Sequence, residues 1–306
     1  AIFQCLQGMY KKCDLNKIIL TASGGPFFGK KAGELQHIRP ADALKHPNWD
    51  MGAKVTIDSS TLMNKGLEFI EAKWLFDMEP DDIDVVVHRE SIVHSLIEYK
   101  DHSVIAQLGV PDMRIPIQYA LTYPRRFPSP VKQLNLADWQ KLTFYAPDEE
   151  TFTCFGACKR AIRRGGTLPA AVNGANEAAV ALFLKEKIGW QDIGELVCHV
   201  ADTFETAPVT SVEDVLEADR KARAYVLERC GESASTVVQG ILLAVIGVLL
   251  FGLIIFIHEF GHFFTAKLSH VCVNEFSIGM GPKLFSFTRG ETQYSLRLLP
   301  IGGYCA

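Results

Sequence analysis

Residues 236–257 constrain the fold of this chain more than any other segment. This stretch of 22 residues contains no charged side chain and is strongly apolar. As a helix it would be about 33 Å long, which matches the hydrocarbon thickness of a bilayer. The sequence therefore predicts one transmembrane helix here.

The predicted span runs directly into His258-Glu259-Phe260-Gly261-His262, an H-E-x-x-H arrangement. Two imidazoles four residues apart share a helix face and can bind one Zn²⁺, while Glu259 can activate the metal-bound water. The alternative is a chance match on a surface helix. We favour the metal site, because a polar cluster at the end of a membrane helix is costly unless it is functional.

Charge divides the chain into two parts. Residues 1–235 carry 27 Lys and Arg and 32 Asp and Glu, whereas residues 236–306 carry four and three. The net charge of −4 gives no surplus of basic residues of the kind that binds nucleic acid.

The eight cysteines form no CxxC pair, which is typical of reduced thiols in a cytosolic protein. We expect a cytoplasmic location for residues 1–231 and a membrane location for residues 236–306.

The stretch 54–68, KVTIDSSTLMNKGLE, concentrates polar groups between two apolar runs. Its β-branched start predicts a buried strand, and its second half predicts a helix that residues 58–61 cap. Asn64, Lys65 and Glu68 follow, so donors for an anion lie beside a hard oxygen ligand for a metal. The alternative is an ordinary capped amphipathic helix with a solvated polar face.

Apolar runs around this stretch predict a small mixed sheet with flanking helices. The expected strands are residues 17–21, 83–88, 94–99 and 103–108. The first strand ends in Ser23-Gly24-Gly25, where backbone can approach a ligand closely and Ser23 adds a hydroxyl donor. His88 and His94 stand at strand ends and are interpreted as structural histidines without a catalytic role.

The expected fold is an α/β catalytic domain with a small mixed sheet, followed by an α-helical bundle, one transmembrane helix and a β-hairpin. Helical periodicity at 154–164, 173–187 and 211–229 predicts the bundle, to which we assign no chemistry of its own. The expected boundaries are 1–122 for the catalytic domain, 123–150 for a proline-rich linker, 151–231 for the bundle, 232–235 for a seam, 236–262 for the transmembrane helix with HEFGH, and 263–306 for the hairpin segment.

Five motifs in the first part are typical of one enzyme family: TASGGPF, HPNWDMGAKVTIDSSTLMNKGLEFIEAKWLF, HRESIVHS, AQLGVPDMRIPI and LPAAVNGANEAAVALFL. On these motifs, residues 1–231 resemble 1-deoxy-D-xylulose 5-phosphate reductoisomerase, the NADPH-dependent enzyme of non-mevalonate isoprenoid biosynthesis. The resemblance implies a metal-assisted rearrangement of the ketose phosphate, then hydride transfer to give 2-C-methyl-D-erythritol 4-phosphate. It also implies NADPH and Mg²⁺ or Mn²⁺ as cofactors, and a homodimer.

The resemblance assigns site residues by their place in these motifs. The implied substrate-binding residues are Ser23, His46, Trp49, Met51, Ser59, Asn64, Lys65 and Glu68. Trp49 and Met51 would close over the substrate, and Gly52 would approach the nicotinamide cofactor. Glu68 would also be a ligand of Mg²⁺ or Mn²⁺.

The sequence departs from this family at its beginning. The glycine-rich NADPH-binding domain and the Asp-Ser-Glu-His stretch, which carries the family's other two metal carboxylates, are absent from the sequence given, which starts at Ala1. A lone Glu68 is a poor cage for a divalent cation. We therefore expect a fragment that is catalytically inactive as given.

The last part carries HEFGH, VNEFSIGMGPKLFSF and RLLPIGGYC. These motifs resemble the N-terminal segment of a site-2-type intramembrane zinc metalloprotease, with a membrane-associated hairpin. The resemblance implies that His258 and His262 bind Zn²⁺ and that Glu259 is the catalytic base. The aspartate that supplies the family's third zinc ligand is absent from the sequence given, so this part too is expected to be inactive.

The two resemblances require opposite membrane orientations. Lys221, Arg223 and Arg229 precede the span and favour a cytosolic start, whereas the protease family begins its first helix outside the cytosol. We therefore expect that the sequence joins segments encoded by two adjacent genes, with the junction near residues 228–236. Three functions remain open: an oxidoreductase fragment, a membrane protease fragment, and a non-catalytic phosphate-binding module tethered to the membrane.

Overall fold

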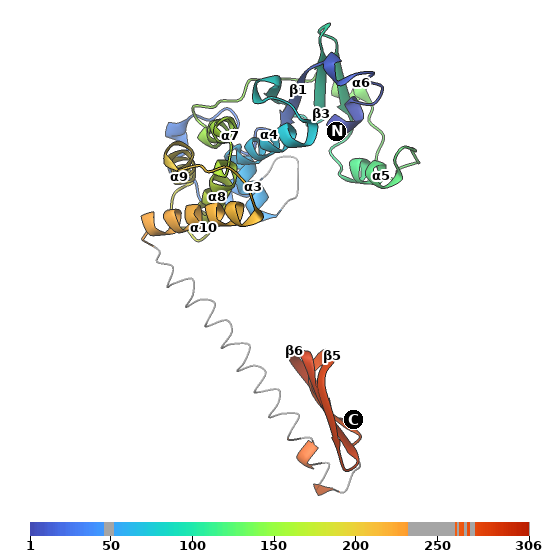
Figure 1. Cartoon of the computed structure of the whole chain (residues 1–306). Helices are drawn as coiled ribbons and strands as arrows, with labels where there is room; N and C mark the ends of the chain where they lie inside the picture. Colours follow the sequence, from blue (N-terminus) through green and yellow to red (C-terminus); the bar gives the residue numbers. More distant parts are fainter. Residues whose placement is uncertain (46–51, 232–260, 262, 266–267, 270–272, 306) are drawn as a thin grey trace. The chain divides into compact units, whose positions relative to one another are not determined.

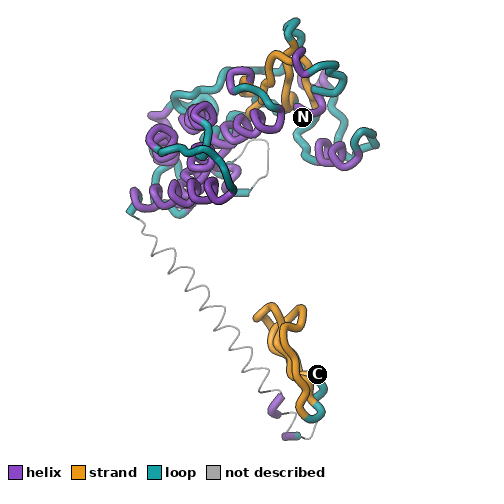
Figure 2. The backbone as a smooth tube through the Cα atoms, in the orientation of Figure 1, coloured by secondary structure: helices purple, strands orange, loops and turns teal. Residues whose placement is uncertain are grey.

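The computed structural model describes residues 1–45, 52–231, 261, 263–265, 268–269 and 273–305. The chain divides into two compact units, Ala1–Gly231 and Glu232–Ala306 (Figure 1). The first unit contains a sheet and a helical bundle, and the second contains a β-hairpin (Figure 2). This agrees with the predicted α/β class and with the predicted hairpin.

A four-stranded mixed sheet forms one side of the first unit, as predicted. Its strands are β1 (Leu15–Ala22), β2 (Ile83–Val87), β3 (Val93–Tyr99) and β4 (Val104–Leu108). The order is β2-β1-β3-β4, with β1 and β2 parallel and the other neighbours antiparallel. Ile18, Leu20 and Ala22 alternate as buried residues along β1. This central strand therefore ends inside the unit, and the loop that begins at Ser23 follows directly from it.

The predicted strand at residues 55–57 is wrong, because these residues lie in helix α3 (Ala53–Ser60). A β-branched residue costs a helix at most about 0.7 kcal/mol. Burial of Thr56 and Ile57, which are 2% and 0% exposed, outweighs that cost. Tertiary packing thus decides the secondary structure of this segment against its local preference.

The helix predicted for the second half of this stretch is confirmed as α4 (Met63–Phe76), but its predicted cap at residues 58–61 is wrong. The N-cap is Leu62, with φ 59° and no side-chain cap hydrogen bond. Ser60 faces the core instead and accepts a hydrogen bond from the Trp190 indole N–H at 2.9 Å. Thr61, the polar residue between the two helices, makes local contacts: it donates to the Asp58 carbonyl at 3.2 Å and accepts the Met63 N–H at 3.4 Å.

The bundle consists of α7 (Thr153–Arg164), α8 (Leu168–Leu184), α9 (Trp190–Thr203) and α10 (Val212–Arg229). The helical periodicity of the sequence predicts each of these except α9. Helix α8 is buried on nearly all sides, and its Gly174 lets α10 approach, since a Cβ there would lie 2.7 Å from Asp219 Oδ1. The predicted capping box of α10, Ser211 with Asp214, is confirmed.

Helix α4 joins the sheet to the bundle, since it packs against β1 and β2 and also against α7 (Figure 1). At the contact with α7, Gly66 lies directly against Cys158. A Cβ on Gly66 would be 2.6 Å from Cys158 Sγ and 2.7 Å from Cys158 Cβ. Both residues are buried, so this contact has no room for another methyl group.

We expect Gly66→Ala to destabilise the first unit by about 2 kcal/mol, although alanine is the better helix former, because α4 and α7 must move apart. The melting temperature should fall by about 4–8 °C. Calorimetry of the full chain checks this value. The matched control is Gly33→Ala, since a Cβ at exposed Gly33 meets no atom within 4 Å. Equal melting temperatures for the two variants would contradict the packing argument.

The predicted linker, residues 123–150, is largely exposed and contains the short helix α6 (Leu136–Trp139). It follows α5 (Arg114–Thr122), which the sequence analysis did not predict. The segment returns to the sheet at Tyr145, which exchanges backbone hydrogen bonds of 2.8 and 2.9 Å with Val87. It is thus anchored to the β2 edge. The remaining elements are α1 (Ile2–Cys5), α2 (Pro40–Ala43) and the 3-10 turns Lys12–Asp14, Ala32–Glu34 and Pro80–Asp82.

The second unit contains the predicted hairpin, formed by β5 (Glu275–Arg289) and β6 (Thr292–Cys305). Residues 276–278 pair both with 294–296 and with 303–305, so the ribbon folds back on itself. The predicted transmembrane segment 236–257 and the predicted zinc-site residues His258, Glu259 and His262 lie outside the described residues. In the part of the chain that is described, no helix combines the length and hydropathy needed to cross a membrane.

Candidate functional site

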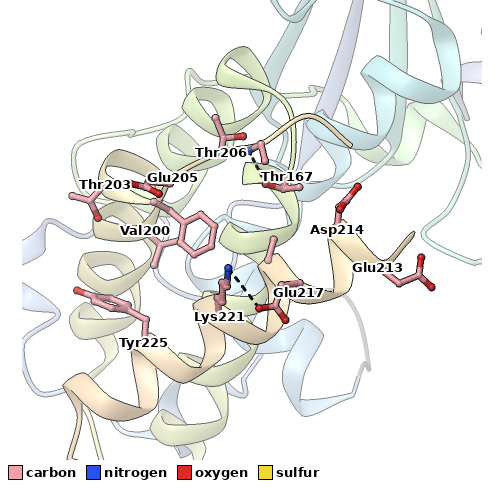
Figure 3. A pocket seen from close by; sticks show the side chains of 13 residues that line it. Thr167, Val200, Thr203, Glu205, Thr206, Glu213, Asp214, Glu217, Lys221 and Tyr225 are labelled. Atoms are coloured by element: carbon pink, nitrogen blue, oxygen red, sulfur yellow. Dashed lines mark hydrogen bonds and ion pairs between the residues drawn. The ribbon is translucent and has the colours of Figure 1, made fainter. Parts of the chain in front are cut away.

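The helical bundle contains a cavity of about 820 Å³ between α9 and α10 (Figure 3). Two of the four carboxylates that line it, Asp214 and Glu217, are engaged in structural contacts. Asp214 accepts hydrogen bonds from Thr210 and from the Ser211 N–H, which lower its pKa to about 2. Glu217 binds Arg220 at 2.7 Å. These groups cap and brace α10, and none of the predicted site residues lines this cavity.

A second cavity, of about 470 Å³, lies where the sheet meets α3 and α4. The predicted site residues that line it are Ser23, Ser59, Asn64, Lys65 and Glu68. They come from the loop after β1, the end of α3 and the first turns of α4. The tertiary structure thus brings together two motifs that lie far apart in the sequence.

The loop after β1 reaches the end of α3 through two glycines. Gly24 and Gly25 have φ of 79° and 66°, a region that favours glycine. A Cβ on Gly25 would lie 2.6 Å from the Ser59 carbonyl oxygen, so only glycine permits this approach. The contact places the Ser23 loop against the helix end that carries Ser59.

Asn64 and Lys65 stand in the first turn of α4, and both bind Glu68 in the following turn. The Asn64 amide donates to Glu68 Oε1 at 2.7 Å, and Lys65 Nζ donates to Glu68 Oε2 at 2.5 Å. The Lys65 side chain is 12% exposed, so its ammonium lies mostly inside the cavity wall. An anion here would meet the partial positive charge of a helix N-terminus and an ammonium that can exchange Glu68 for the anion.

Two histidines that we interpreted as structural also line this cavity. His88 Nε2 accepts the Ile92 N–H at 3.1 Å, so Nδ1 carries the proton and donates to the Thr143 carbonyl at 2.9 Å. Nδ1 also lies 3.0 Å from Glu90 Oε2, so the ring is held in place from both of its nitrogens, as in a structural role. His94 faces Gln107 Oε1 at 3.0 Å and the Ser91 carbonyl at 3.1 Å.

Burial lowers the pKa of His94, and the hydrogen bonds to Gln107 and Ser91 act in the opposite direction. Four further residues line the cavity that were not predicted as site residues: Ser91, His94, Gln107 and Asp112. Gln107 lies on β4, and the only signal for it was the AQLGVPDMRIPI motif, to which no role was assigned. Side chains of neighbouring strands meet through sheet register, which spacing along one strand does not reveal.

Helix α3 is held on the bundle by a buried polar network. Asp58, 1% exposed, accepts hydrogen bonds from Asn176 at 2.9 Å and from Lys54 at 2.7 Å. Lys54 also binds Glu177 at 2.8 Å. Burial raises the pKa of Asp58. Because Ser59 directly follows Asp58, this network sets the position of one predicted phosphate donor.

The described residues of the cavity do not fit a divalent cation, which needs several free oxygen ligands. The two carboxylates that line it are Glu68 and Asp112. Both Glu68 oxygens accept hydrogen bonds from Asn64 and Lys65. Both Asp112 oxygens accept from Arg114, which lowers the pKa of Asp112 to about 2. Among the described residues, no group of three or more His, Cys, Asp or Glu could hold a metal ion.

The described residues also do not form a dinucleotide site. The sheet of the first unit has a single parallel pair, unlike the doubly wound parallel sheet of dinucleotide-binding domains. Gly52, predicted to approach the cofactor, is the exposed N-cap of α3 and does not line the cavity. His46, Trp49 and Met51, predicted to belong to the site, lie outside the described residues.

Two family models match the first unit. Residues 1–76 match the 1-deoxy-D-xylulose 5-phosphate reductoisomerase C-terminal domain, and residues 108–225 match the DXP reductoisomerase C-terminal domain. Residues 1–231 belong to the reductoisomerase family. The reductoisomerase resemblance predicted from the motifs is thereby confirmed.

Known reductoisomerases align with most of this chain. The enzyme of Acetivibrio thermocellus is 54% identical over 228 residues, and that of Clostridium tetani is 54% identical over 229. These alignments cover 74% and 75% of this chain, but 60% and 59% of those relatives. The chain therefore spans about 60% of the length of the reductoisomerases it matches.

Solved reductoisomerase structures share the fold. The Zymomonas mobilis enzyme in complex with NADPH has a TM-score of 0.70 at 40% identity and covers 75% of this chain, while this chain covers 59% of that enzyme. A reductoisomerase in complex with NADPH, fosmidomycin and magnesium also has a TM-score of 0.70, at 41% identity, with coverages of 76% and 61%. Residues 246–306 instead match peptidase family M50. The prediction that segments of two families are joined in this chain is thus confirmed.

Proposed function

We propose that the cavity between the sheet and α4 is the phosphate end of a reductoisomerase substrate site. The observation that carries this proposal is the convergence of hydroxyl, amide and ammonium donors, Ser23, Ser59, Asn64 and Lys65, on one cavity at a helix N-terminus. A solved relative that binds fosmidomycin, a phosphonate, supports the same ligand chemistry.

The whole reductoisomerase would convert 1-deoxy-D-xylulose 5-phosphate to 2-C-methyl-D-erythritol 4-phosphate, with NADPH and Mg²⁺ or Mn²⁺ as cofactors. The part played by this chain is to bind and orient the phosphate: hydroxyls and an amide donate to its oxygens, and Lys65 balances its charge. The described residues form neither a cation cage nor a nucleotide site. We therefore propose that the chain as given binds the phosphate group without turnover.

Calorimetric titration of the full chain in mild detergent with fosmidomycin, and separately with inorganic phosphate, tests this function. We expect saturable one-to-one binding that is unchanged between buffers containing Mg²⁺ and EDTA. Absence of binding by both ligands would overturn the phosphate site. NADPH oxidation by the chain with the ketose phosphate and Mn²⁺ would overturn the lack of turnover.

A second function is favoured by the match of residues 246–306 to peptidase family M50. We propose a transmembrane helix at 236–257, with His258 and His262 as ligands of Zn²⁺ and Glu259 as the base. Structural and catalytic zinc sites use at least three protein ligands, so two histidines should release zinc to a chelator. Metal analysis after dialysis against EDTA checks this expectation, and one retained zinc per chain would contradict it.

We propose that the two parts of the chain occupy different surroundings, with residues 1–231 in the cytoplasm and residues 236–306 in the membrane. The charge difference between the two parts supports this division. Protease digestion of sealed membrane vesicles, followed by detection of the first unit with an antibody, tests it. Protection of the first unit inside vesicles that expose their cytoplasmic face would contradict a cytoplasmic location.

We also propose that the reductoisomerase unit forms a homodimer through β4 and α5. Strand β4 is an edge of the sheet, and its Val104 and Ile105 are 47% and 45% exposed. Ile117 and Leu121 of α5 are 52% and 82% exposed. Exposed apolar side chains beside a free sheet edge are typical of an interaction surface.

We expect Leu121→Glu to shift the full chain in detergent from dimer to monomer, because the charge would be buried in the interface without a partner. Light scattering after size-exclusion chromatography measures the mass. Thr122, the next residue on the helix, hydrogen-bonds the Gln118 carbonyl and serves as a neighbouring control through Thr122→Ser. A dimeric Leu121→Glu variant would place the interface elsewhere.

A further inference from the structure

We propose that Arg89 is a positioning residue that holds the loop after β1 in its ligand-binding geometry. The proposal rests on the function proposed above for the cavity that this loop lines. One guanidinium nitrogen, Arg89 Nη1, donates to the Ser23 carbonyl at 2.8 Å and to the Gly25 carbonyl at 2.7 Å. Arg89 itself does not line the cavity, so it acts through the backbone of the loop.

The loop needs such a brace because its backbone is unusually free. Two consecutive glycines separate Ser23 from the next side chain, and glycine loses more conformational entropy on ordering than any other residue. Arg89 bridges the carbonyls on both sides of Gly24 and thereby closes the turn from outside the cavity. Ser23 and Gly24 then line the cavity on the other side.

The guanidinium is itself held in place. It lies over the Phe28 ring, 5.1 Å from the centroid, and Phe28 packs on Tyr145 with ring centroids 5.1 Å apart. Burial lowers the pKa of Arg89, as expected for a group partly removed from water, but an arginine keeps its charge throughout the physiological range. A planar group clamped by an aromatic ring and bonded to two carbonyls transmits its position to the loop more rigidly than a flexible ammonium would.

Two substitutions separate this positioning role from a simple charge effect. Arg89→Lys keeps the positive charge but removes the planar fork, and Arg89→Met keeps only the packing on Phe28. Lys30 is the matched control, because it is exposed, carries the same charge near the same loop and lies 5.9 Å from the Phe27 centroid. Lys30→Met therefore removes a nearby charge without changing a carbonyl bridge.

The test uses the full chain in detergent with two readouts. The first is hydrogen exchange of the peptide that spans residues 20–29, measured without ligand. The second is the Kd of inorganic phosphate by calorimetry. For Arg89→Met and Arg89→Lys alike we expect faster exchange in this peptide, with the peptides of α7–α9 unchanged. Loss of two charge-assisted hydrogen bonds should weaken phosphate binding by about 10-fold or more, while Lys30→Met should stay within about 2-fold, as for an exposed charge.

Each outcome decides the proposal. Unchanged exchange at 20–29 in both Arg89 variants would overturn it, whatever the ligand does. Full phosphate affinity in Arg89→Lys together with lost affinity in Arg89→Met would show that Arg89 supplies charge and not geometry, and would also overturn it. If the unaltered chain fails to bind phosphate but exchange still rises in the variants, the proposed function fails and the positioning role stands. If Arg89→Met fails to fold, hydrogen exchange and phosphate binding of Arg89→Lys are compared with those of the unaltered chain.

Discussion

Lys65→Ala should weaken the binding of fosmidomycin to the full chain by roughly 100-fold, which is the upper range for loss of a charged hydrogen-bond donor. The Lys65 ammonium is the one cation of α4 that lines the cavity, and its side chain is 12% exposed. Its removal also leaves the Glu68 carboxylate without a counter-charge beside the bound anion. Calorimetry in EDTA-containing buffer measures the change without any contribution from a metal.

Lys73 provides the control for this prediction, because it lies on the same helix but pairs with Glu79 at 3.3 Å, away from the cavity. Lys73→Ala should leave the Kd within about 2-fold of the unaltered chain, as expected for an exposed ion pair. Ser59→Ala removes a neutral donor and should cost about 5-fold. If Lys65→Ala and Ser59→Ala both bind normally, the phosphate site has been placed wrongly.

Glu68→Gln separates the two roles that the sequence assigns to Glu68. In this structure the carboxylate competes with an incoming anion for Lys65 Nζ, to which it is bonded at 2.5 Å. Without metal, the neutral variant should therefore bind phosphate about 3-fold more tightly, because like-charge repulsion is removed. Weaker binding in Glu68→Gln, seen only when Mg²⁺ is present, would instead reveal a cation held by Glu68.

Asp58→Ala should destabilise the first unit by about 3 kcal/mol, because it breaks a buried charged network. Asp58 is 1% exposed and bonds Asn176 and Lys54. Its removal would leave the Asn176 amide, which is 0% exposed, without this acceptor. The melting temperature should fall by about 6–12 °C, measured by calorimetry of the full chain. Asp84→Ala is the control, since Asp84 makes a surface pair with Lys17 at 2.8 Å and should cost at most about 1 kcal/mol.

The difference in the free energy of unfolding between the unaltered chain and Asp58→Ala should depend on pH, and the direction of the pKa shift fixes the sign of that dependence. Burial raises the pKa of Asp58 above its ordinary value of 3.8, so the folded state binds this proton more tightly than the unfolded chain does. Asp58 therefore adds stability as the pH falls through the raised pKa toward 3.8, and loses that contribution as the pH rises. The free energy of unfolding of the unaltered chain, minus that of Asp58→Ala, should widen on acidification. A difference that narrows would show that Asp58 is stabilised in its charged form.

Some elements of this protein follow from local pattern alone. The four sheet strands, α4, α7, α10 and the hairpin around Gly290 were all predicted, because each has a clear apolar period, and all but α4 are also bounded by turn or capping residues. The failure at residues 55–57 has a physical cause. A β-branched run favours a strand by only tenths of a kcal/mol, and burial of Ile57 against the core outweighs this preference.

In the candidate site, too, some features follow from the sequence and others from tertiary packing. The sequence by itself determined which donors are available: Ser23, Ser59, Asn64, Lys65 and Glu68 belong to motifs whose residue types suit a phosphorylated ligand. Only the tertiary structure decided that these motifs share one cavity, that Glu68 is already bonded to its neighbours, and that Arg89 supports the loop from behind. Side-chain chemistry is a property of single residues and can be read along the chain. Proximity between distant residues depends on how sheet register and helix packing bury apolar surface, and no single segment of the chain specifies that arrangement.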